Sequence, residues 1–222
     1  MSRKASKNQN GFTIIELLIA TIVFSVLLIV MLAAFIRTGE LFYKGASMTK
    51  TQNDARNIVQ SIASDIQFTA GVPNNLTANH TTNPSGIFCI GQHRYRYQIG
   101  VQAGQGANYG LARDTVSAGC PPLTGSGSLP VQTASDNQML DAGMQLNNLN
   151  ITCSGAPIGV CSVNIHVIFY GLGSTPDIFS TSDGGYTSAT AYLSPSAQCN
   201  GSLNDTSLCA TVDYDSTVLE NN

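Results

Sequence analysis

A single carboxylate lies near the start of a long apolar segment, where its negative charge is costly without a partner of opposite charge. The segment reads NGFTIIELLIATIVFSVLLIV over residues 10–30, and its only charged residue is Glu16. A carboxylate in a transmembrane helix costs roughly 2.5 to 3.5 kcal/mol at the bilayer centre, less near its edge, and usually marks a function. Cleavage after Gly11 would supply a partner, because the new amine of Phe12 lies four residues before Glu16 on the same helix face. Such a cut would give the carboxylate a cation to pair with, either its own amine or that of a neighbouring chain.

The element that must position this carboxylate is a membrane helix. Residues 17–36 carry no charge, and twenty residues at about 1.5 Å rise span the roughly 30 Å hydrocarbon core of a bilayer. Arg3, Lys4 and Lys7 precede the segment without an acidic residue, so the positive-inside rule leaves the N-terminus in the cytoplasm. The apolar run is longer than that of a secretory signal, and no convincing A-x-A site follows it. We expect a retained single-pass helix and an extracytoplasmic head.

The leader and the helix together form a wider pattern. A short basic leader is followed by Gly11, an uninterrupted apolar helix, and at its start the run Phe12-Thr13-Ile14-Ile15-Glu16-Leu17. This pattern resembles the class III signal of type IV pilins and pseudopilins, closely over residues 3–36 and more loosely to about residue 71. In that family a prepilin peptidase cuts after the glycine and methylates the new N-terminal residue. The resemblance thus implies that Gly11 and Phe12 form the processing site, that Phe12 is methylated, and that Glu16 meets the amine of an adjacent subunit during assembly.

The resemblance also implies a place in a filament. Residues 55–71 are similar to the corresponding helix of PilW-like minor pilins and J-type minor pseudopilins, which favours a minor subunit over a major pilin. Implied partners are the prepilin peptidase/N-methyltransferase, other major and minor subunits, and the inner membrane before assembly. After assembly the chain would lie in an extracellular pilus, where a position at the tip is favoured, or in a periplasmic pseudopilus. Two alternatives stay open: a minor pseudopilin of a type II secretion system, and a signal-anchored extracytoplasmic binding module or adhesin whose ligand meets the head loops.

The pattern of apolar residues predicts four segments. These are a leader (1–11), a transmembrane or filament-core helix (12–36), an amphipathic continuation (37–71) and a head (72–222). Residues 12–70 contain no proline, so one helix can run through them, with Gly71 and Pro73 ending it. An apolar stripe at helical spacing should pack under the head; it consists of Ala55, Ile58, Val59, Ile62, Ala63 and Ile66. Polar residues, among them Asp54 and Asp65, are expected on the other faces.

The head is rich in Gly, Ser, Thr and Asn, which is typical of short strands separated by loops. The fold class predicted is α+β, a long N-terminal helix packed on an antiparallel sheet with long disulfide-linked loops. The clearest strand contains Val163, Ile165, Val167 and Phe169 on one apolar face, which should contact the helix. Candidate strands cover residues 87–90, 93–101, 109–113, 138–152, 162–170 and 208–213. Long loops are expected over residues 73–86, 121–136 and 171–206.

Six cysteines, all in the head, indicate disulfides in an exported domain. Fifteen connectivities are possible, and the simplest joins neighbours along the chain. The pairs expected are Cys89 with Cys120, Cys153 with Cys161, and Cys199 with Cys209. A zinc site is disfavoured because no C-x-x-C pair occurs and only His80, His93 and His166 are available. We expect neither a metal nor a cofactor.

Charge argues against nucleic-acid binding by the head. Residues 1–71 hold seven of the ten Lys and Arg against four acids, whereas residues 72–222 hold three Arg, no Lys and nine acids. An acidic head lacks the basic surface that phosphate contacts need. Arg94 and Arg96 alternate with Tyr95 and Tyr97, as a stacking platform would. On a strand this alternation instead predicts tyrosines facing inward and arginines in solvent.

No pattern in the head supports enzymatic chemistry. There is no G-x-S-x-G, and the three histidines are scattered, so a nucleophilic triad has no specific support. His166 on its strand face is expected to be solvated or hydrogen-bonded. Asp205, Asp213 and Asp215 lie near the C-terminus, but their spacing matches no D-x-[DN]-x-[DN]-G calcium loop. They are interpreted as solvated acids, and the protein is not expected to be an enzyme.

Overall fold

The computed structural model describes these parts of the 222-residue chain: residues 12–68, 75–79, 81, 83–104, 110–116, 137–154, 159–170, 179–181, 197–199 and 209–219. The chain forms two compact units, Met1–Phe42 and Tyr43–Asn222. Several residues named above lie outside the described residues, namely Gly11, Gly71, Pro73, His80, Cys120 and Asp205.

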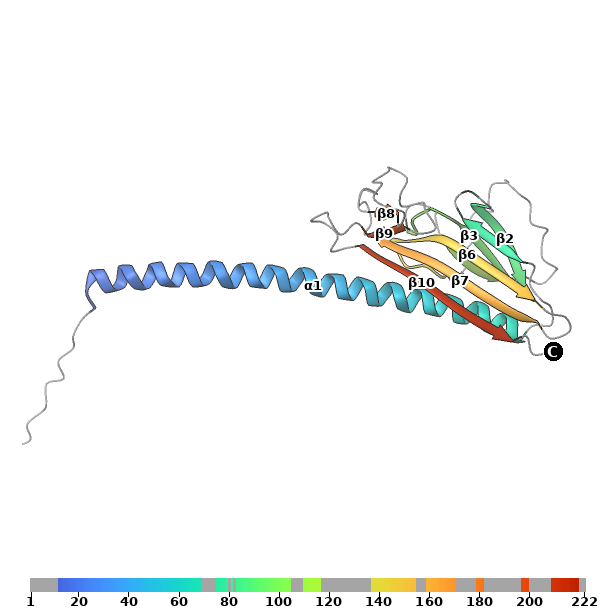
Figure 1. The fold of residues 1–222 in the computed structure, drawn as a ribbon, viewed down its shortest axis with the longest axis horizontal. Coiled ribbons are helices and arrows are strands. Elements are labelled where there is room, and N and C mark those ends of the chain that lie inside the picture. Colours follow the sequence, from blue (N-terminus) through green and yellow to red (C-terminus); the bar gives the residue numbers. More distant parts are fainter. Residues whose placement is uncertain are drawn as a thin grey trace, which may run out of the picture. The chain divides into compact units, whose positions relative to one another are not determined.

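One helix, α1, runs from Ile14 to Phe68 over 55 residues (Figure 1). The absence of proline and the presence of only two interior glycines, Gly39 and Gly45, allow this length. The helix expected over residues 12–70 is therefore confirmed within two residues at each end. By length and composition its apolar part is long enough to cross a membrane, with a mean hydropathy of 3.0 over its most apolar window.

The larger strand layer of the head is a four-stranded antiparallel sheet in the order β1-β6-β7-β10. Its strands are β1 (Leu76–Asn79), β6 (Met144–Ser154), β7 (Val160–Tyr170) and β10 (Cys209–Leu219). β10 pairs with β7 over all eleven of its residues, from Cys209 opposite Tyr170 to Leu219 opposite Val160. Between β6 and β7 the register shifts at Leu146/Asn148, which marks a β-bulge.

A second four-stranded sheet has the order β2-β3-β4-β5. It consists of β2 (Ser85–Ile90), β3 (His93–Gln98), β4 (Leu111–Thr115) and β5 (Asn137–Gln138), and a separate pair joins β8 (Phe179–Thr181) to β9 (Ala197–Cys199). Two residues connect β2 to β3, and the first, Gly91, has φ 59°, a left-handed conformation that glycine adopts without strain.

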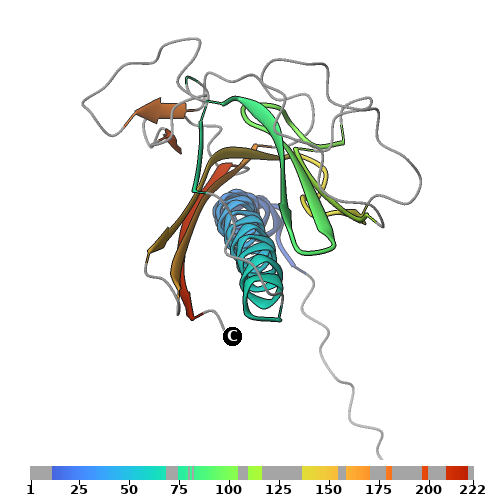
Figure 2. The same cartoon turned by 90° about the vertical axis from the view of Figure 1, so that its right-hand side faces the viewer.

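The core lies between the C-terminal half of α1 and the two sheets. Figure 2 shows the strands of the head on two sides of this part of the helix, with β7 and β10 on one side and β2 and β3 on the other. Within unit 2, the helix stripe and the inner faces of both sheets form one cluster of buried apolar side chains. The stripe is buried as expected, with Ala63 partly buried, and Val163, Ile165 and Val167 of β7 are buried in the same cluster. The α+β fold class is confirmed.

Some expectations on the strands are wrong. The strand expected over residues 138–152 is broken, because β5 ends at Gln138 and β6 begins at Met144 after Gly143, whose φ of 88° turns the chain. β1, β8 and β9 lie in stretches interpreted as loops; with three or four residues each, they are too short to show a clear alternation. β10 continues six residues beyond the expected 213, because β7 supplies a partner along its whole length.

Candidate functional site

The N-terminal end of α1 contains a closed set of local hydrogen bonds around Glu16. Its carboxylate Oε2 accepts from the backbone N of Thr13 at 3.0 Å and from the Thr13 hydroxyl at 2.9 Å. In return, the Thr13 Oγ1 accepts from the backbone N of Glu16 at 3.3 Å. Because α1 begins at Ile14, Thr13 is the N-cap and Glu16 is the third helical residue, the geometry of a capping box.

Sequence reasoning missed this second role of the glutamate. The signal was present, since Thr13-Ile14-Ile15-Glu16 is a T-x-x-E pattern ahead of an apolar run. A carboxylate at the helix start also interacts favourably with the partial positive charge of the helix N-terminus. Glu16 is therefore satisfied within its own chain at the point where processing would place a new amine on Phe12.

The apolar side chains on both sides of Glu16, from Phe12 to Ile36, have no cover among the described residues. Phe12 is 86% exposed and Ile14 is 88% exposed, and the large apolar side chains from residues 15 to 36 are at least about half exposed. This amount of exposed apolar surface requires a non-aqueous environment or other helices around it. The helix is consistent with a single membrane anchor, as its hydropathy also indicates.

A second polar site holds the far end of α1 to the second sheet. Asp65 is 7% exposed; its Oδ2 accepts from the hydroxyl of Tyr95 on β3 at 2.6 Å, and its Oδ1 accepts from Arg113 on β4 at 2.7 Å. Arg113 also donates to Ser61 Oγ at 3.1 Å, and Tyr95 stacks on Phe88 with ring centroids 4.8 Å apart. The sequence pattern places Asp65 outside the apolar stripe, yet the residue is buried, because two donors from the sheet reach it inside the head.

Two groups in the head have shifted pKa values with identifiable causes. Burial raises the pKa of Tyr95, and the hydrogen bond to Asp65 and the negative charge of that carboxylate raise it further. Burial also raises the pKa of Asp54 on α1, and the nearby charge of Asp141 adds to the effect. Asp141 itself forms an ion pair with Lys50 at 2.8 Å, and this lysine opposes the shift of Asp54.

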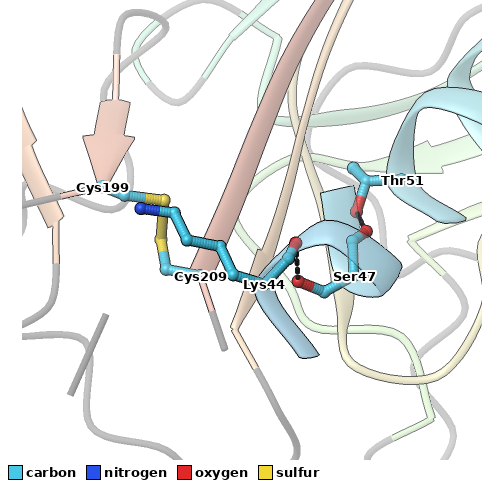
Figure 3. Close-up of a disulfide and its surroundings, with 5 residues drawn as sticks. All are labelled: Lys44, Ser47, Thr51, Cys199 and Cys209. Carbon is cyan, nitrogen blue, oxygen red and sulfur yellow. Dashed lines mark hydrogen bonds between the residues drawn. A yellow bond between two sulfur atoms is a disulfide. The ribbon is translucent and has the colours of Figure 1, made fainter. Parts of the chain in front are cut away.

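Disulfides close the loops of the head. Cys153 pairs with Cys161, which lie opposite each other on β6 and β7, and Cys199 pairs with Cys209, as neighbour pairing predicts. Cys89 is disulfide-bonded, and the expected partner Cys120 lies outside the described residues. Figure 3 shows the Cys199–Cys209 bond, which joins β9 to β10, with Lys44, Ser47 and Thr51 of α1 in its surroundings.

The sequence also draws attention to the alternating tyrosines and arginines of β3. Tyr95 and Tyr97 are buried as expected. The prediction that both arginines lie in solvent is wrong for Arg96, which is 1% exposed, whereas Arg94 is partly exposed and forms an ion pair with Asp114 on β4. With Arg96 buried and Arg94 paired, β3 does not present two free basic groups for a stacking platform.

The histidine and the acids near the C-terminus meet across two strands. His166 is buried on β7, which excludes the solvated alternative, and its Nδ1 lies 2.8 Å from Oδ1 of Asp213 on β10. Asp213 and Asp215 are exposed. Among the described residues, no group of three or more His, Cys, Asp or Glu side chains is arranged to hold a metal ion.

The comparisons with known proteins add one match, at the N-terminus. The family model of the prokaryotic N-terminal methylation motif matches residues 6–32, which include Gly11, Phe12 and Glu16. No curated protein and no solved structure matches the chain. A methylation motif at the start of an exposed apolar helix defines a class of proteins anchored by an N-terminal helix. The match supports an N-terminal signal of the kind found in type IV pilin-like proteins and pseudopilins, and it does not extend into the head.

Proposed function

We propose that this chain is a minor pilin subunit of a type IV pilus or a related filament. The observation that carries the proposal is the methylation motif over residues 6–32, on a helix whose apolar side chains are exposed from Phe12 onward. Motifs of this kind imply processing by a prepilin peptidase and assembly with other pilins. The helix would lie in the inner membrane before assembly, with the head outside the cytoplasm, and in the filament core afterwards.

The residues proposed for each step follow from this assignment. The peptidase cuts after Gly11 and methylates Phe12. The new amine then lies next to the capping box of Thr13 and Glu16, where the exposed carboxylate accepts from its own chain through Oε2. On assembly, Glu16 meets the amine of a neighbouring subunit, a charge pair that has far less competition from water once apolar helices surround it.

The proposal of a minor, tip-located role rests on residues 55–71 and on the head. The similarity of residues 55–71 to PilW-like minor pilins and J-type pseudopilins favours it, and the disulfide-bonded head supplies loops that could prime assembly or display an adhesive surface. A minor pseudopilin of a type II secretion system uses the same leader and helix. We favour the pilus, and the genes beside the coding sequence would separate the two.

The processing step is tested by intact mass and N-terminal sequencing of protein from membranes and sheared filaments, with and without the prepilin peptidase. We expect a chain beginning at Phe12 with one added methyl group, and a full-length chain when the peptidase is absent. Gly11→Ala should block cleavage, whereas Ser6→Ala in the same leader should not affect it. Normal maturation of the Gly11→Ala variant would refute the assignment and return the protein to a signal-anchored binding module.

A further inference from the structure

The second side of β10, which no described strand pairs with, is suited to bind another chain. β10 is the last strand of its sheet, and along its eleven residues the only described strand that pairs with it is β7 (Figure 1). Alternate residues of an antiparallel strand direct their N–H and C=O groups away from the partner already bound. β10 therefore presents a row of backbone donors and acceptors on its second side, and the described residues form no backbone hydrogen bond there.

Most of the usual protections of a strand edge are missing from β10, the exception being the exposed carboxylates of Asp213 and Asp215. Natural edge strands are kept short, bulged, or marked by lysine and proline. β10 contains neither lysine nor proline, has eleven residues, and pairs with β7 without a register shift. The opposite edge of the same sheet, by contrast, is the four-residue strand β1. The β10 edge is the longer and less protected of the two.

The charge of the β10 side chains limits which segments can bind at this edge. Asp213 and Asp215 are exposed and lie on one face of the strand, because residues two apart share a face. Each is oriented by a neighbour on β7: Asp213 by His166 at 2.8 Å, and Asp215 by a hydrogen bond from the Asn164 amide. The two carboxylates are thus held about 7 Å apart along the strand.

A second copy of the chain does not fit this edge well. Antiparallel pairing of two β10 strands centred on Tyr214 would place Asp213 of each opposite Asp215 of the other. Like charges directly opposite each other destabilise a strand pair. The same two carboxylates favour a strand that carries positive charges at alternate positions, since these would lie opposite them on the same face.

We propose that the β10 edge binds, by strand addition, an extended segment of another protein that carries Lys or Arg at alternate positions. Backbone hydrogen bonds to the open side of β10 would hold the segment, and Asp213 and Asp215 would select its charge and register. This proposal does not depend on the assembly role, since it concerns only the head. Its failure would leave processing at Gly11 untouched.

The test uses the full chain in uncharged detergent micelles and three synthetic peptides. The first, Thr-Val-Lys-Val-Arg-Val-Thr, has alternating basic residues; the second has the same composition with Lys and Arg adjacent; the third has Glu at both basic positions. Binding is measured by titration, and residue-resolved amide hydrogen exchange is measured in the free and bound states. We expect the first peptide to bind most tightly and to protect alternate amides of β10.

Variants separate the edge from charge alone. Asp213→Asn/Asp215→Asn keeps the side-chain shapes and should weaken binding of the first peptide about fivefold at low salt, with little difference near 1 M salt. Glu40→Gln, an exposed carboxylate on α1, should change nothing. Hydrogen exchange on the unmodified protein needs no variant to fold. Binding without protection of β10 amides, equal binding of the three peptides, or self-association of the protein through β10 would each overturn the proposal.

Discussion

Replacing Asp65 by asparagine should be among the most destabilising single changes in the head. Asparagine keeps the shape of the side chain but removes the charge that accepts from Tyr95 at 2.6 Å and from Arg113 at 2.7 Å. Breaking a buried ion pair by removing one partner costs about 3 to 5 kcal/mol, because the other charge stays buried. The side chain of Arg113 is 26% exposed, so water can partly solvate it and the lower end of this range applies. We expect Asp65→Asn to lower the free energy of unfolding by about 3 kcal/mol.

The assay for this prediction is urea unfolding of the full chain in micelles. Circular dichroism or tyrosine fluorescence serves as the probe, since the protein has no tryptophan. Gln60→Ala, at an exposed position of the same helix, is the control and should stay within about 0.5 kcal/mol of the unmodified protein. Asp65→Asn/Arg113→Met removes both charges and should recover part of the loss. A cost below about 1 kcal/mol for Asp65→Asn would show that Asp65 does not anchor the helix to the second sheet.

Two further changes test the head. Burial and the charge of Asp141 raise the pKa of Asp54 above its unfolded value, so the folded state is stabilised at low pH and loses that contribution as pH rises from the unfolded towards the folded pKa. Asp54→Asn should therefore raise the free energy of unfolding at neutral pH, by less than about 1 kcal/mol because the group is partly exposed. The measurement is the free energy of unfolding of both proteins from pH 3 to 7. Two curves that stay parallel over this range would contradict this cause. Cys153→Ser/Cys161→Ser opens the cross-link between β6 and β7 and should cost about 2.5 kcal/mol in the chain-entropy model; an unchanged urea midpoint would show that the bond adds no stability.

Those features that depend on neighbouring residues could be predicted from the sequence. The leader and Glu16 stand out because charge is rare in an apolar run. The length of α1 follows from the absence of proline, and the alternation in Val163–Val167 indicates which face of β7 meets the helix. Cysteines close along the chain, such as Cys153 and Cys161, pair because a hairpin brings them opposite each other.

Other features depend on residues that are distant in the sequence, and the sequence pattern does not contain them. β1 exists because it pairs with β6, more than sixty residues later, and β10 extends to Leu219 because β7 pairs with all of it. Arg96 is buried although its strand pattern places it on the face expected to be solvated.

Thus the sequence by itself determined the anchor, the N-terminal motif and the fold class, because helix length, charge and alternation are local properties. The tertiary structure decided which polar groups are buried and which strands lie at the edges of the sheet. From the sequence, Asp65 is predicted only to lie on a helix; the packing of the helix against the second sheet brings Tyr95 and Arg113 to it. From the sequence, Asp213 and Asp215 are predicted to be solvated acids, and only the strand order places them on an edge strand of the sheet.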